Sequence, residues 1–96
     1  MIKKLIDISP NSEAIALQML GFLAADETRL ESFLKLTGIA PQQLRQLAAN
    51  PHFLAGVMDH LLADQSALLA FCAEAGIKPE SAVRARRHLP GATDDF

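Results

Sequence analysis

Residues 61–79 read LLADQSALLAFCAEAGIKP, and residues 23–41, which lie 38 positions earlier, read LAADETRLESFLKLTGIAP. The two stretches share eight identical residues in a window of 19, including the Asp, the Gly-Ile pair and the Pro. Two unrelated stretches rarely share Asp, Gly and Pro residues at the same spacing. Such similarity at a fixed offset is the signature of an internal repeat. The pattern predicts two tandem three-helix units with an offset of 38, related by a pseudo-two-fold axis.

Each unit is expected to contain a hydrophobic helix, a second helix, a Gly-Ile-x-Pro corner and a third helix. Asp26 and Asp64 are expected to cap the second helix of each unit, because their carboxylates accept hydrogen bonds from unpaired N–H groups. Gly38 and Gly76 are expected to end those helices in the left-handed conformation. The six expected helices span about 10–25, 27–37, 41–49, 51–63, 65–75 and 79–88.

Local sequence signals indicate where the helical domain begins and ends. Ser9 is suited to cap the first helix, and Pro10 fits the first helical position, where its missing N–H costs nothing. Residues 90–96 show no helical periodicity. We therefore expect an N-terminal arm at 1–9, a single helical domain at 10–89 and a disordered tail at 90–96.

Composition supports an all-α fold. The 96 residues are 50% hydrophobic and 21% charged, which is enough apolar material to bury a core. The chain contains 16 Ala and 15 Leu but only two Val, and it lacks Tyr and Trp, so helix formers dominate. We predict a compact bundle of about six short helices in one domain and exclude global disorder.

The first and fourth helices are apolar almost all the way round, which predicts two central helices enclosed by the other four. Their exceptions are Gln18 and Gly21 in the first and Gly56 and Asp59 in the fourth. A helical glycine costs about 1 kcal/mol relative to alanine, and close backbone approach would compensate. An antiparallel crossing is therefore expected to set Gly21 against Gly56, with Gln18 beside Asp59.

Cysteine content and hydropathy bear on location. The single cysteine, Cys72, cannot form an intramolecular disulfide, which favours a reducing cytoplasm. Its helical spacing with apolar neighbours predicts an inert core thiol. Asp7 and Pro10 interrupt the N-terminus before a signal-peptide core forms. The longest nearly apolar run, 14–25, is shorter than the roughly 20 residues of a membrane span, so no membrane association is expected.

The last helix is the one basic cluster of an otherwise acidic chain. Residues 78–88 carry four basic residues against one acidic residue, and Arg84, Arg86 and Arg87 could contact phosphates after a helix-turn-helix corner. Against that interpretation, Glu80 occupies the helix N-terminus, which usually meets the bases. Cations near a helix C-terminus are also favourable without nucleic acid. A packing corner is therefore the favoured interpretation.

Catalytic and metal-binding patterns are weak. His52, His60 and Asp64 have helical spacing, but two or three ligands without a cysteine pair do not define a metal site. An enzyme would need a convergent polar pocket, for which only Gln18, Asp59 and His60 are candidates. No phosphate-binding glycine loop or serine motif is present. We therefore predict a non-enzymatic protein with no catalytic residues, no metal and no cofactor.

Several segments between Glu13 and Gly91 resemble a family of short proteobacterial proteins, the domain of unknown function 3572. The most specific part is the Pro-x-Phe-Leu-Ala-x-Val-x-Asp pattern of residues 51–59, while Met58 and His60 depart from the expected apolar residues. The resemblance implies a bacterial cytoplasmic helical domain and transfers no activity or ligand. The matching segments are Phe22-Leu23-Ala24, Phe33, Gly38, Leu44-Arg45, Ala49-Asn50-Pro51-His52-Phe53-Leu54, Val57-Met58-Asp59, Phe71-Cys72, Ala85-Arg86 and Leu89-Pro90-Gly91.

The expected function is a small helical protein-interaction module or a homo-oligomer. A chain this small has a high surface-to-volume ratio, so association is a plausible way to bury leftover apolar area. The alternative is a helix-turn-helix-like nucleic-acid-binding protein that uses the basic last helix. Any small-molecule ligand is left open. The candidate partner-binding residues are Arg84, Arg86, Arg87 and Asp59.

Overall fold

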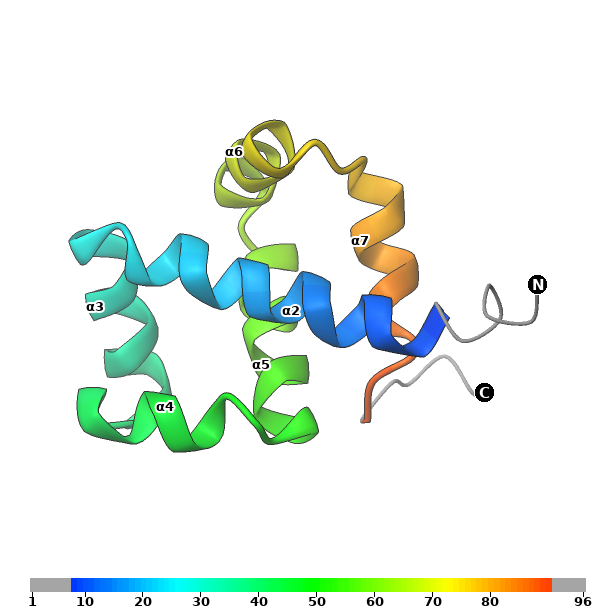
Figure 1. Ribbon diagram of the computed structural model, residues 1–96. Coiled ribbons are helices and arrows are strands. Elements are labelled where there is room, and N and C mark those ends of the chain that lie inside the picture. Colours follow the sequence, from blue (N-terminus) through cyan, green and yellow to red (C-terminus); the bar gives the residue numbers. More distant parts are fainter. Residues whose placement is uncertain (1–7, 91–96) are drawn as a thin grey trace.

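The computed structural model describes residues 8–90, with the side chains of residues 12–90 (Figure 1). This part of the chain forms six α-helices, one short 3-10 helix and no strand, so the all-α prediction is confirmed. Residues 1–7 of the expected arm and 91–96 of the expected tail lie outside the described range. The elements are α2 (Ile8–Ala24), α3 (Glu27–Thr37), η1 (Pro41–Gln43), α4 (Leu44–Leu47), α5 (Pro51–Leu62), α6 (Gln65–Ala75) and α7 (Pro79–Arg86).

Three helices begin at side-chain caps. The carboxylates of Asp26 and Asp64 and the side-chain carbonyl of Asn50 each accept backbone N–H groups from the first turn that follows, at 2.8–3.3 Å. The helix after Asn50 has Pro51 at its first position, where no donor is needed. The predicted caps at Asp26 and Asp64 are therefore confirmed.

The two glycine corners share one backbone geometry. Gly38 has a φ of 75° and Gly76 a φ of 71°, and both end their helices in the left-handed conformation that L side chains rarely adopt. The Gly38 N–H donates to the Leu34 carbonyl at 2.8 Å, and the Gly76 N–H donates to the Cys72 carbonyl at 2.9 Å. The predicted ends of α3 and α6 are confirmed.

Other helix boundaries differ from the predictions. α2 begins at Ile8, two residues before the expected start, so Ser9 is a helical residue; its side chain, and with it the expected cap, lies outside the described side chains. The expected helix at 41–49 is a 3-10 turn followed by the four-residue α4, because the chain must already turn again before Asn50. α7 ends at Arg86 and continues as turns, so it is shorter than expected.

The core lies where α2 crosses α5 (Figure 1). α3 packs against α2, α6 packs against α5, and α7 packs against both central helices. The fully buried side chains come mostly from α2, α3 and α5. The largest of them are Met19, Leu23, Phe33, Val57, Met58 and Leu61.

The two halves are not packed equivalently. α7 contacts both α2 and α5, whereas its counterpart α4 makes its main contacts with η1. The local backbone of the caps and corners repeats at a spacing of 38, but the third helices occupy different environments. The expected enclosure of both central helices is wrong, because α2 keeps a solvent-exposed face and Gly56 and Asp59 of α5 are exposed as well.

The predicted close approach of two glycines is also wrong. Gly21 and Gly56 are exposed, and a Cβ built at either position would meet no atom within 4 Å. The core is formed instead by larger side chains such as Met19 of α2 and Val57 of α5. Asp59 pairs with Arg86 rather than lying beside Gln18. Both glycines therefore face outwards.

No helix of the described part of the chain is both long enough and apolar enough to cross a membrane. α2, the longest helix, has 17 residues and contains Asn11, Glu13 and Gln18. A span requires about 20 predominantly apolar residues.

Candidate functional site

The exposed face of α2 carries no charged residue over three turns. Residues at helical spacing on this face are small or apolar apart from one amide, and Leu17 is 46% exposed. An uncharged exposed strip on a central helix is informative because most exposed helix faces are charged or polar. The residues of this face are Ala14, Leu17, Gln18, Gly21, Ala24 and Ala25.

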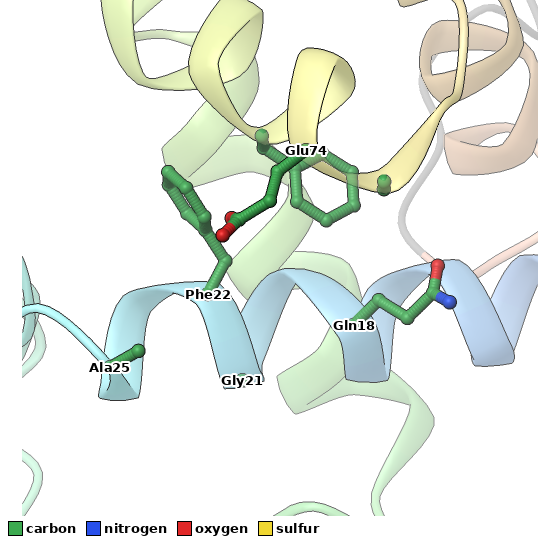
Figure 2. Close-up of a pocket in the computed structure, with 7 residues that line it drawn as sticks. Gln18, Gly21, Phe22, Ala25 and Glu74 are labelled. Atoms are coloured by element: carbon green, nitrogen blue, oxygen red, sulfur yellow. The ribbon is translucent and has the colours of Figure 1, made fainter.

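A groove of about 290 Å³ adjoins this face, between α2 and α6 (Figure 2). The Phe22 and Phe71 rings meet edge to face at its base, with centroids 5.7 Å apart and an interplanar angle of 74°. Figure 2 shows the Phe22 ring and the Glu74 side chain approaching each other from the two helices. We call the exposed face of α2 together with this groove the α2 surface. The groove is lined by Gln18, Gly21, Phe22, Ala25, Phe71, Glu74 and Ala75.

The rim of the groove is fixed by a small electrostatic cluster. The Arg29 guanidinium lies 4.9 Å from the centroid of the Phe22 ring, within the range of a cation–π contact. The same guanidinium donates to the Asp26 carboxylate at 3.1 Å, and Asp26 also caps α3. Phe22 is therefore held between Phe71 and Arg29, so the base of the groove is preorganised.

The predicted partner-binding residues fall into two groups. Arg86 donates from Nε and Nη2 to the two carboxylate oxygens of Asp59, at 2.7 and 3.1 Å. Its Nη1 donates to the backbone carbonyls of Leu89 and Pro90, at 3.3 and 3.1 Å. The Arg86 side chain is 13% exposed. Arg86 and Asp59 are therefore engaged with each other and tie the end of α7 to α5.

Arg84 of α7 and Arg87, the residue that follows this helix, are both exposed. They border a shallow groove of about 250 Å³ together with Glu80 and Val83. The carboxylate of Glu80 reduces the positive potential of this groove, because opposite charges at short range compensate each other. The basic cluster of the last helix is thus divided between an internal ion pair and a mixed-charge surface.

A third groove, of about 350 Å³, follows the outer side of α3 and is lined by residues of that helix alone. Two carboxylates alternate with two leucines along it. One helix face without a facing element gives little shape selectivity. Its lining residues are Glu27, Leu30, Glu31 and Leu34.

The side chains considered for an enzyme or metal site have separate neighbours. Gln18 lines the α2–α6 groove, Asp59 binds Arg86, and the His60 ring packs edge to face on Phe33 with centroids 5.0 Å apart. Between residues 8 and 90, no group of three or more His, Cys, Asp or Glu side chains is arranged to hold a metal ion. These residues therefore do not form one convergent polar pocket.

Cys72 lies in the core, as predicted, and is 5% exposed. Burial raises the pKa of its thiol, and the Glu80 carboxylate adds to this increase. Both effects disfavour the thiolate, which is the reactive form. Cys72 is therefore a packing residue rather than a nucleophile.

Sequence reasoning missed the α2 surface because it treated the apolar character of α2 as a sign of complete burial. The available signal was the run of small residues on one face of that helix. Ala14, Gly21 and Ala25 leave room for a neighbouring chain, whereas core positions such as Met19 are filled by large side chains. Only the packing of the other helices reveals which face stays uncovered.

Fold and surface together define a small all-α domain with a preorganised groove between two helices. The chain belongs to the family described as "Protein of unknown function (DUF3572)", whose model matches residues 9–92. The family expected from the sequence is confirmed. No curated protein and no solved structure matches the chain.

Proposed function

We propose that the chain is a non-enzymatic protein-interaction module that binds its partner through the α2 surface. The observation that carries this proposal is the uncharged, solvent-exposed face of α2 beside a groove based on Phe22 and Phe71. Burying the exposed face of α2 on binding requires no removal of a charge from water, and the one carboxylate that lines the groove, Glu74, stands at its edge. The gain comes from covering Leu17 and the partly exposed Phe22.

The geometry favours an apolar segment as the bound element. A ring pair at the base and small residues on one wall accept a protruding aliphatic or aromatic side chain, as in helix-in-groove recognition. Gln18 and Glu74 stand at the edge, where polar groups give orientation. We place this activity in the cytoplasm, for which the support is the unpaired Cys72.

The nucleic-acid alternative has weaker support. It requires several arginines facing one phosphate backbone, but Arg86 is held by Asp59 and two carbonyls. Arg84 and Arg87 share their groove with Glu80. A steep decrease of nucleic-acid affinity with rising salt, abolished in an Arg84→Ala, Arg87→Ala variant, would favour this alternative over ours.

Site-specific photo-crosslinking in the native cells tests the proposal. A benzophenone amino acid replaces Leu17 in one variant and Leu69 in the matched control, since these leucines are 46% and 48% exposed on different helices. We expect a nuclease-resistant protein adduct from position 17 and none from position 69. Equal adducts from both positions, or none from position 17, would contradict a binding role for the α2 surface.

A further inference from the structure

The shallow groove along α7 combines an apolar side chain with two arginines. Val83 is 45% exposed, and Arg84 and Arg87 border the same groove of about 250 Å³, which we call the α7 groove. Residues three or four positions apart lie on one face of a helix, so Arg87 shares a face with both Val83 and Arg84. Arg84 forms no ion pair with any described residue. The α7 groove therefore suits an acidic segment that also carries an apolar residue.

The acidic residue that lines the α7 groove stands at its far end. Glu80 lies in the first turn of α7, and Arg87 follows the last residue of this helix. The seven positions that separate them correspond to a rise of about 10 Å along the helix axis. A segment that enters from the C-terminal end of α7 therefore meets both arginines before it meets the Glu80 carboxylate.

The chain itself brings an acidic segment to the C-terminal end of α7. Nη1 of Arg86 donates to the carbonyls of Leu89 and Pro90, at 3.3 and 3.1 Å, so the backbone before residue 91 is tied to the last residue of this helix. Residues 91–96 lie outside the described range, and their sequence carries two carboxylates, one aromatic ring and no basic side chain. They are Gly91, Ala92, Thr93, Asp94, Asp95 and Phe96. An acidic and partly apolar segment therefore begins beside the α7 groove.

This segment is long enough to reach both arginines. Residues 91–94 span up to about 14 Å when extended, at roughly 3.4 Å per residue. Arg86 and Arg87 are consecutive, so their side chains point about 100° apart, which is an arc of about 9 Å at a helix radius of about 5 Å. Arg84 lies about 4.5 Å further along the helix axis. Asp94 therefore reaches either arginine without release of the contacts at Arg86.

We propose that residues 91–96 bind the α7 groove of the same molecule. The carboxylates of Asp94 and Asp95 pair with the two arginines, and the Phe96 ring covers Val83. Opposite charge selects this segment as the occupant, because the groove carries more basic than acidic residues. Exposed ion pairs are individually weak, and covalent attachment compensates by raising the effective concentration to the order of millimolar. The contact is therefore reversible and sensitive to salt.

Occupation by this segment gives α7 a role that differs from nucleic-acid binding. The two arginines are neutralised from within the chain, so a polyanion competes with the acidic segment for the same guanidinium groups. The α7 groove shares no lining residue with the α2 surface. This inference therefore stands or fails independently of the proposed function.

The valine methyl resonances of the full chain test the contact. The chain contains two valines, of which Val57 is fully buried in α5 and serves as the internal control. We expect the Phe96 ring to shift the methyl resonances of Val83, so that they differ between wild type and Phe96→Leu while those of Val57 do not. High salt, or Asp94→Asn with Asp95→Asn, is expected to remove at least half of this shift. Val83 resonances that coincide in wild type and Phe96→Leu would overturn the inference.

Charge reversal tests the pairing. Arg84→Asp with Arg87→Asp is expected to abolish the ring-induced shift, and the further addition of Asp94→Arg with Asp95→Arg is expected to restore it. Arg45→Asp, at an exposed position of α4, is the matched control and is expected to leave the shift unchanged. Failure of the reversed charges to restore the shift would contradict the ion pairs.

Dilution tests whether the contact forms within one molecule. An intramolecular contact does not depend on protein concentration, so we expect the ring-induced shift to stay constant between about 50 μM and about 1 mM. A shift that grows over this range would show that the segment binds a second copy, and would overturn the intramolecular contact.

Binding of a fluorescent single-stranded DNA oligonucleotide at low salt tests the competition. We expect Asp94→Asn with Asp95→Asn to bind it at least about threefold more tightly than wild type, because the arginines are then uncovered. Glu27→Gln with Glu31→Gln changes the net charge equally on exposed positions of α3, and is expected to raise the affinity less than about twofold. Equal gains in both variants would show that only net charge matters and would contradict the competition.

Discussion

At the scale of single residues, Cys72 links stability to pH. Its pKa in the folded chain lies above the ordinary value of 9.0, mainly because of burial. Between the unfolded-state and folded-state pKa values the unfolded chain loses the thiol proton while the folded chain keeps it, so stability decreases as pH rises. We expect urea unfolding to show a free energy of unfolding that decreases as the pH rises from ~8 to ~9.5.

Cys72→Ala is the control for this titration. The variant is expected to be less stable than wild type at pH ~8, because a buried side chain loses volume. Its free energy of unfolding is expected to stay level up to pH ~9.5. An equal decrease in the variant would show that another group causes the pH dependence.

Arg86 and Asp59 contribute unequally to stability. Arg86 is 13% exposed and binds two carbonyls besides the carboxylate, whereas Asp59 is 58% exposed. Solvent screening therefore reduces the value of the carboxylate more than that of the guanidinium. We expect Arg86→Ala to cost about 1–2 kcal/mol and Asp59→Ala about 0.5–1 kcal/mol, measured by urea unfolding.

The double variant is expected to cost less than the two single costs combined, because the substitutions remove one shared contact. Arg84→Ala, on the exposed side of the same helix, is the matched control and is expected to stay within about 0.5 kcal/mol of wild type. A larger cost for Asp59→Ala than for Arg86→Ala would contradict the importance of the two carbonyl contacts.

At the scale of helices, glycine substitutions are expected to act in opposite directions. Gly56 lies inside α5 with open space at its Cβ position, so Gly56→Ala is expected to stabilise the chain by about 0.5–1 kcal/mol. Gly38 ends α3 at a φ of 75°, so Gly38→Ala is expected to destabilise it by about 1 kcal/mol. Thermal unfolding of both variants measures the signs. A lower melting temperature for Gly56→Ala would contradict the open space at this position and would support the close helix approach that was predicted from the sequence.

Helix signals in this sequence were readable because they depend on neighbours along the chain. The bounds of α3 and α6 follow from Asp26 and Asp64 at one end and from Gly38 and Gly76 at the other. The length of the third helix was overestimated. The expected helix at 41–49 is divided into a 3-10 turn, Pro41–Gln43, and the four-residue α4. Local rules place the helices and say little about how far each one extends.

At the scale of the whole molecule, the features that the sequence missed all join distant segments. The Arg86–Asp59 pair joins residues 27 positions apart, and the α2–α6 groove needs Phe22 and Phe71 from different halves. A repeat read from the sequence suggested equal halves, but α7 covers the central helices and α4 does not. Which face of α2 stays uncovered depends on how the other helices pack, so the run of small residues on that face is a signal that can be interpreted only once the packing is known.

The contacts of Arg86 with two backbone carbonyls also hold the segment that follows α7. Because Nη1 donates to the carbonyls of both Leu89 and Pro90, the backbone there is tied to the guanidinium that Asp59 of α5 also binds. A fluorophore attached at residue 90 would therefore rotate with the domain rather than independently of it. Its anisotropy would report the tumbling of the whole particle, which makes this end of the chain a natural place for an optical probe of assembly.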